Sequence, residues 1–158
     1  MIRKQYNNFR DHVPLFLCCA LLPVIIGGLV YLFWRPDSIA FLGWLNVIGL
    51  DRSLVHLRIQ VAPLYIYLPE WVIYSLPNGL WAFSYAFIIT ALWWPTLTAL
   101  KYLWLATIPL VGLGYEVMQY LGIIPGVFCY TDLVLCFIGV VSGMAVAVML
   151  SKPLAINI

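Results

Sequence analysis

The chain has 158 residues, of which 65% are hydrophobic and 9% are charged, and its formal net charge is +2. A soluble globular domain carries about 25% charged residues, so this composition excludes most folds that must cover themselves with polar surface. It predicts an all-α, multi-pass (polytopic) integral membrane helical bundle, with a buried subunit of a large soluble assembly as the alternative. The eight basic residues form no cluster dense enough for nucleic acid.

The first predicted span covers residues 15–34. Its twenty residues exceed the apolar core of an ordinary signal peptide, so we expect a retained helix. Trp34 closes it, and an aromatic residue at that position is typical of a helix end at the membrane interface.

The region after the first span is the least regular. Residues 38–50 are apolar over only thirteen positions, which is short for a crossing and predicts a re-entrant or interfacial helix. Residues 56–61 alternate polar and apolar, as a short strand would. Arg52, His56 and Gln60 would equally share one face of a helix, so both alternatives stay open.

Three further spans are predicted at 79–94, 102–122 and 132–150, which makes residues 1–158 a single transmembrane domain with four crossings. Pro109 is expected to interrupt the third of the four spans. Asn78 precedes the second span and is a candidate N-cap residue. With the N-terminus inside, five Lys and Arg residues lie on the cytoplasmic side and three lie outside, and both termini are cytoplasmic. A fifth crossing formed by 38–50 would give the same count, but that segment is short.

Two of the six acidic residues, Glu116 and Asp132, lie in the last third of the chain. Glu116 lies about 9 Å inside the end of the third span. A carboxylate at that depth is expected to face the helix bundle or a water-filled pocket, and Gln119 shares its helix face. The loop 123–131 makes the last two spans antiparallel and brings Asp132 near. The alternatives are a structural hydrogen bond for Glu116, helix-to-helix hydrogen bonding for Gln119 and an ordinary N-cap for Asp132.

The last span carries a stripe of residues on one face. Asp132, Cys136, Gly139 and Gly143 follow at intervals of four, three and four residues. Gly139 and Gly143 form a GxxxG pattern, which permits close helix approach in a membrane, so they are predicted helix-packing positions. We expect this stripe to face the helix that carries Glu116.

This C-terminal stretch resembles the signature of the VanZ-like family of small multi-pass bacterial membrane proteins. In that family E-x-x-Q precedes a P-G-R turn and then D-x-x-x-N-x-x-G-x-x-x-G. The matching residues are Glu116, Gln119, Pro125, Gly126, Phe128, Asp132, Gly139 and Gly143. Val127 and Cys136 replace the arginine and the asparagine. The resemblance implies a cell-envelope protein of the bacterial cytoplasmic (inner) membrane, in a family linked to glycopeptide resistance, and it implies no named reaction.

The first functional hypothesis is a polar pocket near the outer leaflet that binds or modifies an envelope lipid or another amphiphile. Glu116 and Asp132 are the candidate catalytic residues, because two carboxylates in different environments can act as general acid and base. The candidate ligand-binding residues are Gln119, Trp81, Tyr85, Arg58 and His56. On the outer side, phosphate binding or anchoring at the membrane interface is expected of Arg35, Arg52, His56 and Arg58.

The second hypothesis is a non-catalytic subunit that scaffolds or regulates a membrane protein partner through the GxxxG stripe. A transporter or channel is a third option, for which four spans would have to oligomerise. The four cysteines lack CxxC spacing and nearby histidines, so the sequence predicts no metal site, and it points to no cofactor. Whether the protein is an enzyme is left open.

Overall fold

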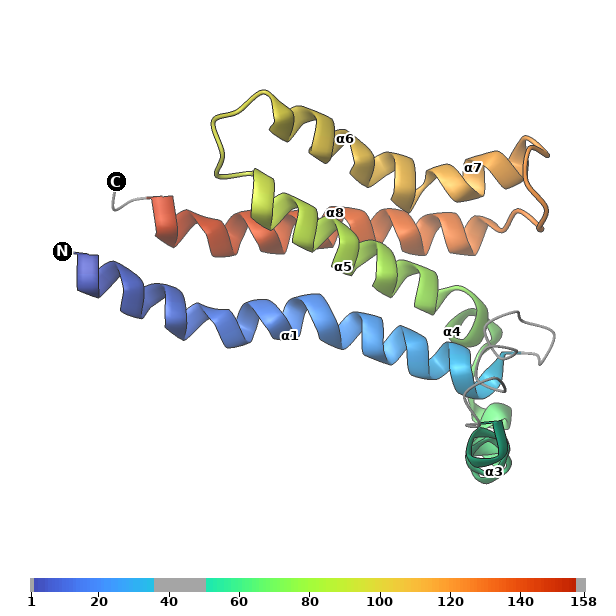
Figure 1. Cartoon of the computed structure of the whole chain (residues 1–158). Coiled ribbons are helices and arrows are strands. Elements are labelled where there is room, and N and C mark those ends of the chain that lie inside the picture. The colour runs from blue at the N-terminus through green and yellow to red at the C-terminus, as the bar shows by residue number, and fades with distance from the viewer. Residues whose placement is uncertain (1, 36–50, 156–158) are drawn as a thin grey trace.

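The computed structural model describes residues 2–35 and 51–155, and every regular element within them is a helix, as predicted. Several of these helices run alongside one another (Figure 1). They are α1 (Ile2–Trp34), α5 (Leu76–Trp93), α6 (Leu100–Gly112), α7 (Gly114–Tyr120) and α8 (Tyr130–Ala155). The re-entrant or interfacial segment predicted at 38–50 lies outside the described residues.

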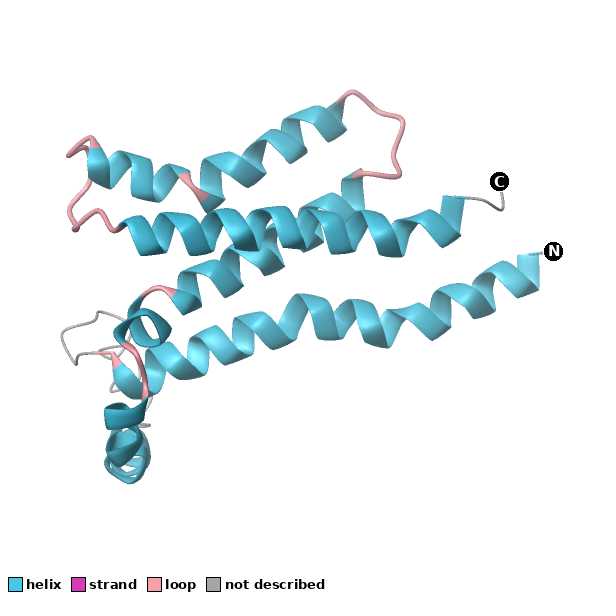
Figure 2. Ribbon diagram, turned by 180° about the vertical axis from the view of Figure 1, so that it is seen from behind, coloured by secondary structure: helices cyan, strands magenta, loops and turns pink. Residues whose placement is uncertain are grey.

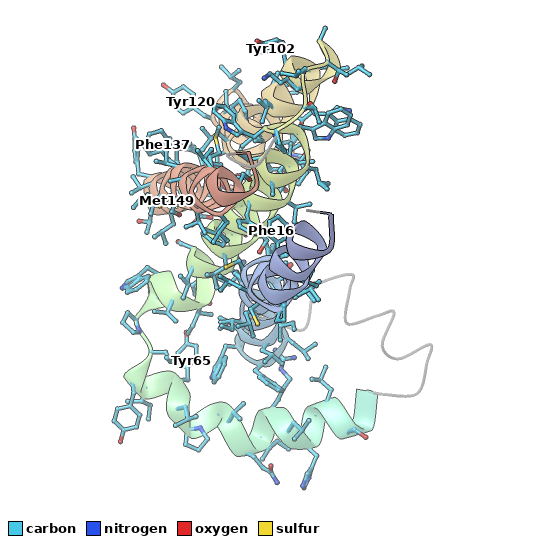
Figure 3. All side chains as sticks on the ribbon, turned by 90° about the vertical axis from the view of Figure 1, so that its left-hand side faces the viewer. Phe16, Tyr65, Tyr102, Tyr120, Phe137 and Met149 are labelled. Carbon is cyan, nitrogen blue, oxygen red and sulfur yellow. The ribbon has the colours of Figure 1, made fainter. Side chains whose placement is uncertain are left out.

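Three short helices lie at the end of the bundle away from the start of α1 and the end of α8 (Figures 1 and 2). They are α3 (Asp51–Val61), the 3-10 helix η1 (Ala62–Tyr67) and α4 (Glu70–Tyr74). Figure 3 shows that α3 lies across the bundle rather than along it. The strand alternative is therefore wrong, and the helical one is correct: the ring of His56 and the amide of Gln60 are one turn apart, 3.2 Å from each other.

Two of the described helices are long and apolar enough to cross a membrane, over Val13–Trp34 and Tyr130–Ser151. They match the first and last predicted spans. Only 11% and 28% of their most apolar stretches are buried inside the protein. A core helix of a soluble protein would be covered by its neighbours, whereas these two expose most of their apolar surface.

The third span, predicted at 102–122 with an interruption at Pro109, is interrupted at Leu113 instead, where the helix divides into α6 and α7. Leu113 leaves the helical conformation with φ −121°, although its N–H still bonds the carbonyl of Pro109 at 3.0 Å. The break has a local cause: Gly112 and Gly114 flank Leu113, and glycine is a poor helix former. Pro109 lies inside α6 and does not end it.

The tightest packing in the bundle is between α5 and α8. A Cβ added at Gly139 would overlap the carbonyl oxygen of Gly79, and one at Gly143 would overlap the carbonyl oxygen of Phe83. The packing role of both glycines is thus confirmed, because any side chain there would force the backbones apart. Their partner is α5, however, so the prediction that the stripe faces the helix of Glu116 is wrong.

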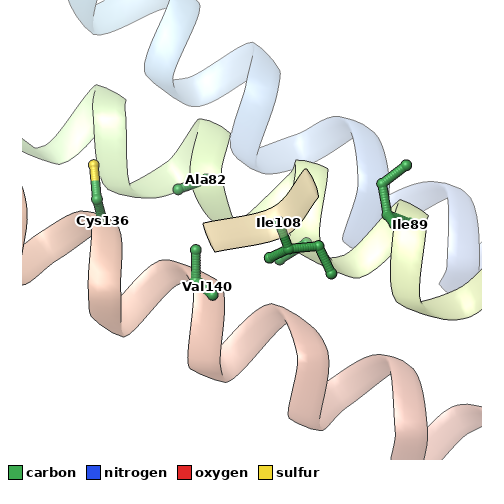
Figure 4. Packing of buried hydrophobic residues seen from close by; sticks show 6 residues of the cluster. Ala82, Ile89, Ile108, Cys136 and Val140 are labelled. Atoms are coloured by element: carbon green, nitrogen blue, oxygen red, sulfur yellow. The ribbon is translucent and has the colours of Figure 1, made fainter. Parts of the chain in front are cut away.

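The helix α6 packs beside this seam. Ile108 is fully buried among Ala82 and Ile89 of α5 and Val140 of α8 (Figure 4). Gly112 also lies against α8, since a Cβ added there would come within 2.7 Å of a Val140 methyl group. The α5–α8 seam and its neighbours therefore fix the positions of the helices that carry the polar residues.

Candidate functional site

A cavity of about 600 Å³ lies at the α4 end of the bundle, where α5 and α8 leave the glycine seam. Its walls come from α1, α4, α5, α7, α8 and the loop that joins the last two. The lining residues are Tyr31, Arg35, Tyr74, Asn78, Trp81, Tyr115, Glu116, Gln119, Gly126, Val127, Cys129 and Asp132. The cavity thus collects ionisable groups from the beginning, the middle and the end of the chain.

Glu116 is the most deeply buried of these ionisable residues, with 4% of its surface exposed. Its carboxylate accepts a hydrogen bond from the backbone N–H of Cys129. Its second oxygen, Oε2, has no hydrogen-bond partner. Burying this carboxylate costs free energy of folding, because an oxygen without a partner has lost its hydrogen bonds to water.

The loop after α7 folds back over the cavity and positions Gln119. Gly122 and Gly126 have φ values of +69° and +140°, which favour glycine, and they let the chain reverse direction. The Gln119 amide lies directly against Gly126, so that any side chain at Gly126 would overlap it. Gln119 therefore lines the cavity and packs against the loop, rather than against α8.

Asp132 belongs to the first turn of α8, and its partner is Asn78. The Asn78 amide donates to Asp132 Oδ2 at 3.2 Å, while Oδ1 has no partner. Both N-cap interpretations are wrong, since each residue is the third of its helix, and the residue that precedes α5 is Ser75. Asp132 still benefits from the positive end of the α8 dipole.

Arg35 follows the last residue of α1 and supplies the positive charge of the cavity. One guanidinium nitrogen donates to the carbonyl of Tyr74 at 2.7 Å, and Nε has no partner. The guanidinium also lies over the rings of Tyr31 and Tyr74, 5.1 and 5.0 Å from their centres. Among the described residues, Arg35 forms no ion pair with Glu116 or Asp132.

A second, more apolar cavity of about 370 Å³ adjoins the first and shares four of its residues, Asn78, Trp81, Tyr115 and Glu116. Its remaining walls are Ala82, Tyr85, Val111, Gly112 and Cys136. The Tyr85 hydroxyl donates to Thr107 at 2.8 Å and so spans α5 and α6. Together the two cavities form a polar compartment that continues into an apolar one.

The structure brings Glu116, Asp132, Gln119 and Trp81 into one cavity and places Tyr85 in the adjoining one. It does not bring His56 or Arg58 there. His56 is exposed on α3. Arg58 donates to the carbonyls of Phe33 and Arg35 and lines a separate cavity.

Sequence reasoning placed Arg35 among the outer-side residues that could bind phosphate or anchor the interface, without linking it to the two acids, and it gave Asn78 no role as the partner of Asp132. Arg35 looks like an ordinary interface anchor after Trp34, and Asn78 looks like a helix cap. The contacts that make them site residues span 39 and 54 positions along the chain. No local pattern carries that information.

No protein-family model matches the chain, and neither a curated protein nor a solved structure matches it. Within the described residues, no three His, Cys, Asp or Glu side chains lie close enough together to hold a metal ion. The function therefore has to be inferred from the cavity and its chemistry.

Proposed function

We propose that the protein is a four-span membrane protein of the bacterial cell envelope that binds the polar head of a lipid or another amphiphile in the Glu116–Asp132 cavity. Its α1 and α8 are long enough to cross a membrane. The 18 residues of α5 extend about 27 Å, close to the roughly 30 Å hydrocarbon thickness. The broken pair α6 and α7 would form the remaining span, because irregular backbone is tolerated where it lines a cavity.

Aromatic and basic residues gather at both ends of the bundle, which supports this arrangement. At one end Trp93 stacks on Trp104 at 5.5 Å, and Lys101 lies 5.9 Å from the ring centre of Trp94. At the other end Arg35 lies over the rings of Tyr31 and Tyr74. Such belts anchor helices at the two interfaces of a membrane.

An even number of spans agrees with the helix directions, because α1 starts and α8 ends on the same side (Figure 1). The cavity lies at the opposite end. If the positive-inside rule places the termini in the cytoplasm, the cavity belongs to the outer leaflet of the inner membrane.

One observation carries the binding proposal. Glu116 and Asp132 each hold a carboxylate oxygen without a hydrogen-bond partner, in a cavity that continues into an apolar compartment. Intramembrane acids are costly and mark functional pathways or binding sites. A ligand with a polar head and an apolar tail would satisfy both compartments.

The VanZ-like resemblance supports the envelope assignment, and the two departures from that pattern have substitutes in the cavity. Val127 lines the cavity where the family has arginine, and Arg35 supplies a guanidinium to the same space. Cys136 stands where the family has asparagine, and Asn78 supplies an amide to Asp132. Catalysis by the two acids stays a prediction.

The scaffold alternative has lost its main support. It rested on the GxxxG stripe as a surface for a partner protein, whereas Gly139 and Gly143 are buried against α5. A partner would have to dock elsewhere, and no feature of the described residues favours such a site.

The proposal is tested by identifying the amphiphiles that stay with the protein through purification in a mild detergent. We expect the wild type to retain an amphiphile in near-stoichiometric amount, and Glu116→Gln/Asp132→Asn to retain much less. Glu70→Gln is the control, since Glu70 lies on α4 and does not line the cavity. Equal retention by the wild type and the double variant would refute the proposed function.

A further inference from the structure

The charges in the cavity are separated rather than paired. Glu116 and Asp132 lie close enough to interact electrostatically with each other. Arg35 is held by the carbonyl of Tyr74 and by two aromatic rings, and it forms no ion pair with either acid. The cavity therefore offers an acidic wall and a basic wall at the same time, each with hydrogen-bonding atoms that have no partner in the protein.

We propose, on the basis of the function proposed above, that the ligand carries an aminoalkyl phosphate head. Its primary ammonium binds the unpartnered oxygens of Glu116 and Asp132, and its phosphate binds Arg35. A primary ammonium has three donors and suits two carboxylate oxygens. A guanidinium is the preferred side chain for phosphate recognition in a desolvated site.

The size of such a head suits the cavity. Arg35, Glu116 and Asp132 all line the same cavity of about 600 Å³. In an aminoethyl phosphate, four bonds of about 1.5 Å each separate phosphorus from nitrogen and span roughly 5 Å. A head of this size is small enough to enter the cavity.

Heads of other charge fit the two walls less well. An anionic head could place its phosphate at Arg35, but it would offer no cation to Glu116 and Asp132. A trimethylammonium head has no N–H donor, so it would leave the unpartnered oxygens unsatisfied. The rings of Tyr31 and Trp81, 5.5 Å apart, could instead accept it by a cation–π contact, which makes that head the informative competitor.

The test is a lipid titration of the detergent-solubilised full chain, read out by native mass spectrometry. The probes are phosphatidylethanolamine, phosphatidylcholine and phosphatidylglycerol with identical acyl chains. We expect phosphatidylethanolamine to bind about tenfold more tightly than the other two, since only it satisfies both walls. Soluble phosphoethanolamine is added as a competitor: competition at equal concentration identifies a free aminoalkyl phosphate as the ligand, and weak competition identifies the lipid.

Variants of the acidic and the basic residues test which part of the lipid head each wall binds. Glu116→Gln/Asp132→Asn should reduce phosphatidylethanolamine binding about tenfold and leave phosphatidylglycerol binding unchanged or stronger. Arg35→Gln should weaken all three lipids. Glu70→Gln serves again as the control.

Equal binding of the three lipids by the wild type, or stronger binding of phosphatidylcholine, would overturn the aminoalkyl phosphate assignment. If Arg35→Gln still weakened all of them, the amphiphile site would stand. If no cavity variant changed the binding of any lipid, the proposed function itself would fall.

Discussion

The contact between α5 and α8 has two halves that differ in chemistry. From Gly143 to Gly139 the backbones approach so closely that no side chain fits between them. Next to Gly79 the contact becomes polar, because Asn78 bonds Asp132 at the wall of a cavity. The first half holds the helices in register, and the second uses that register to position an acid.

This difference separates stability from function within one helix pair. The glycines of the seam pack against backbone. The cavity, by contrast, contains charged residues with buried atoms that have no partner, which cost stability. Substitutions in the glycine seam should therefore lower stability, whereas substitutions in the cavity should lower amphiphile binding and leave stability the same or higher.

The largest effect is expected in the seam. Gly139→Leu should lose the folded state, because the new side chain overlaps the Gly79 carbonyl, and we expect a cost of at least about 3 kcal/mol. The measurement is thermal unfolding in detergent. Gly28→Leu is the matched control on α1, since a Cβ at Gly28 meets no heavy atom within 4 Å. Similar melting temperatures for the two variants would show that the seam is not tight.

The opposite signature is expected at Glu116. Glu116→Gln removes a buried charge with an unpartnered oxygen and keeps the volume, so the melting temperature should stay the same or rise. Amphiphile retention should nevertheless fall about tenfold, as charged hydrogen bonds contribute about 1.5–3 kcal/mol. A variant that loses stability and keeps its amphiphile would assign Glu116 to structure alone.

The bond between Asn78 and Asp132 can be measured by a double-mutant cycle. Asn78→Ala removes the side-chain partner of Asp132, so the coupling free energy with Asp132→Asn should be about 1–2 kcal/mol. Chemical or thermal unfolding of the two single variants and the double variant gives this value. A coupling near zero would mean that the two residues do not interact.

The smallest effect is expected at Arg35. Arg35→Lys keeps the charge but loses the planar contact with Tyr31 and Tyr74, which should cost about 0.5–1 kcal/mol. Unfolding experiments measure this loss, and Lys101→Arg at the other end of the bundle is the control. A loss of stability as large as that of Gly139→Leu would mean that this end of the bundle is packed as tightly as the glycine seam.

Sequence patterns predicted the features that depend on local spacing. The all-α class, the apolar stretches of α1 and α8 and the packing role of Gly139 and Gly143 follow from apolar runs and from the GxxxG interval. The interruption of the third span was predicted at Pro109, whereas it lies at Leu113, between two glycines. A proline is tolerated inside a helix when neighbouring groups compensate, whereas two glycines weaken the helix at that point.

The cavity was predictable only in part. Glu116 and Asp132 were expected to meet because a short loop makes their helices antiparallel. The roles of Arg35 and Asn78 depend on how α1 and α5 pack, and helix packing in a membrane follows shape and small residues rather than a readable charge pattern. His56 and Arg58 were assigned to the site because they were placed on the outer side of the membrane, which does not determine a contact.

The central claim, that two acids and one arginine share a single cavity, can be tested most directly at Cys129, whose side chain lines it. With the other three cysteines replaced by alanine, Cys129 is labelled with cationic and anionic methanethiosulfonates of similar size. Asp132→Asn should lower the ratio of cationic to anionic labelling rates, and Arg35→Gln should raise it. Each change should be roughly fivefold, for an interaction of about 1 kcal/mol between charges. If neither variant changes the ratio, the three residues do not share a cavity and the account is wrong.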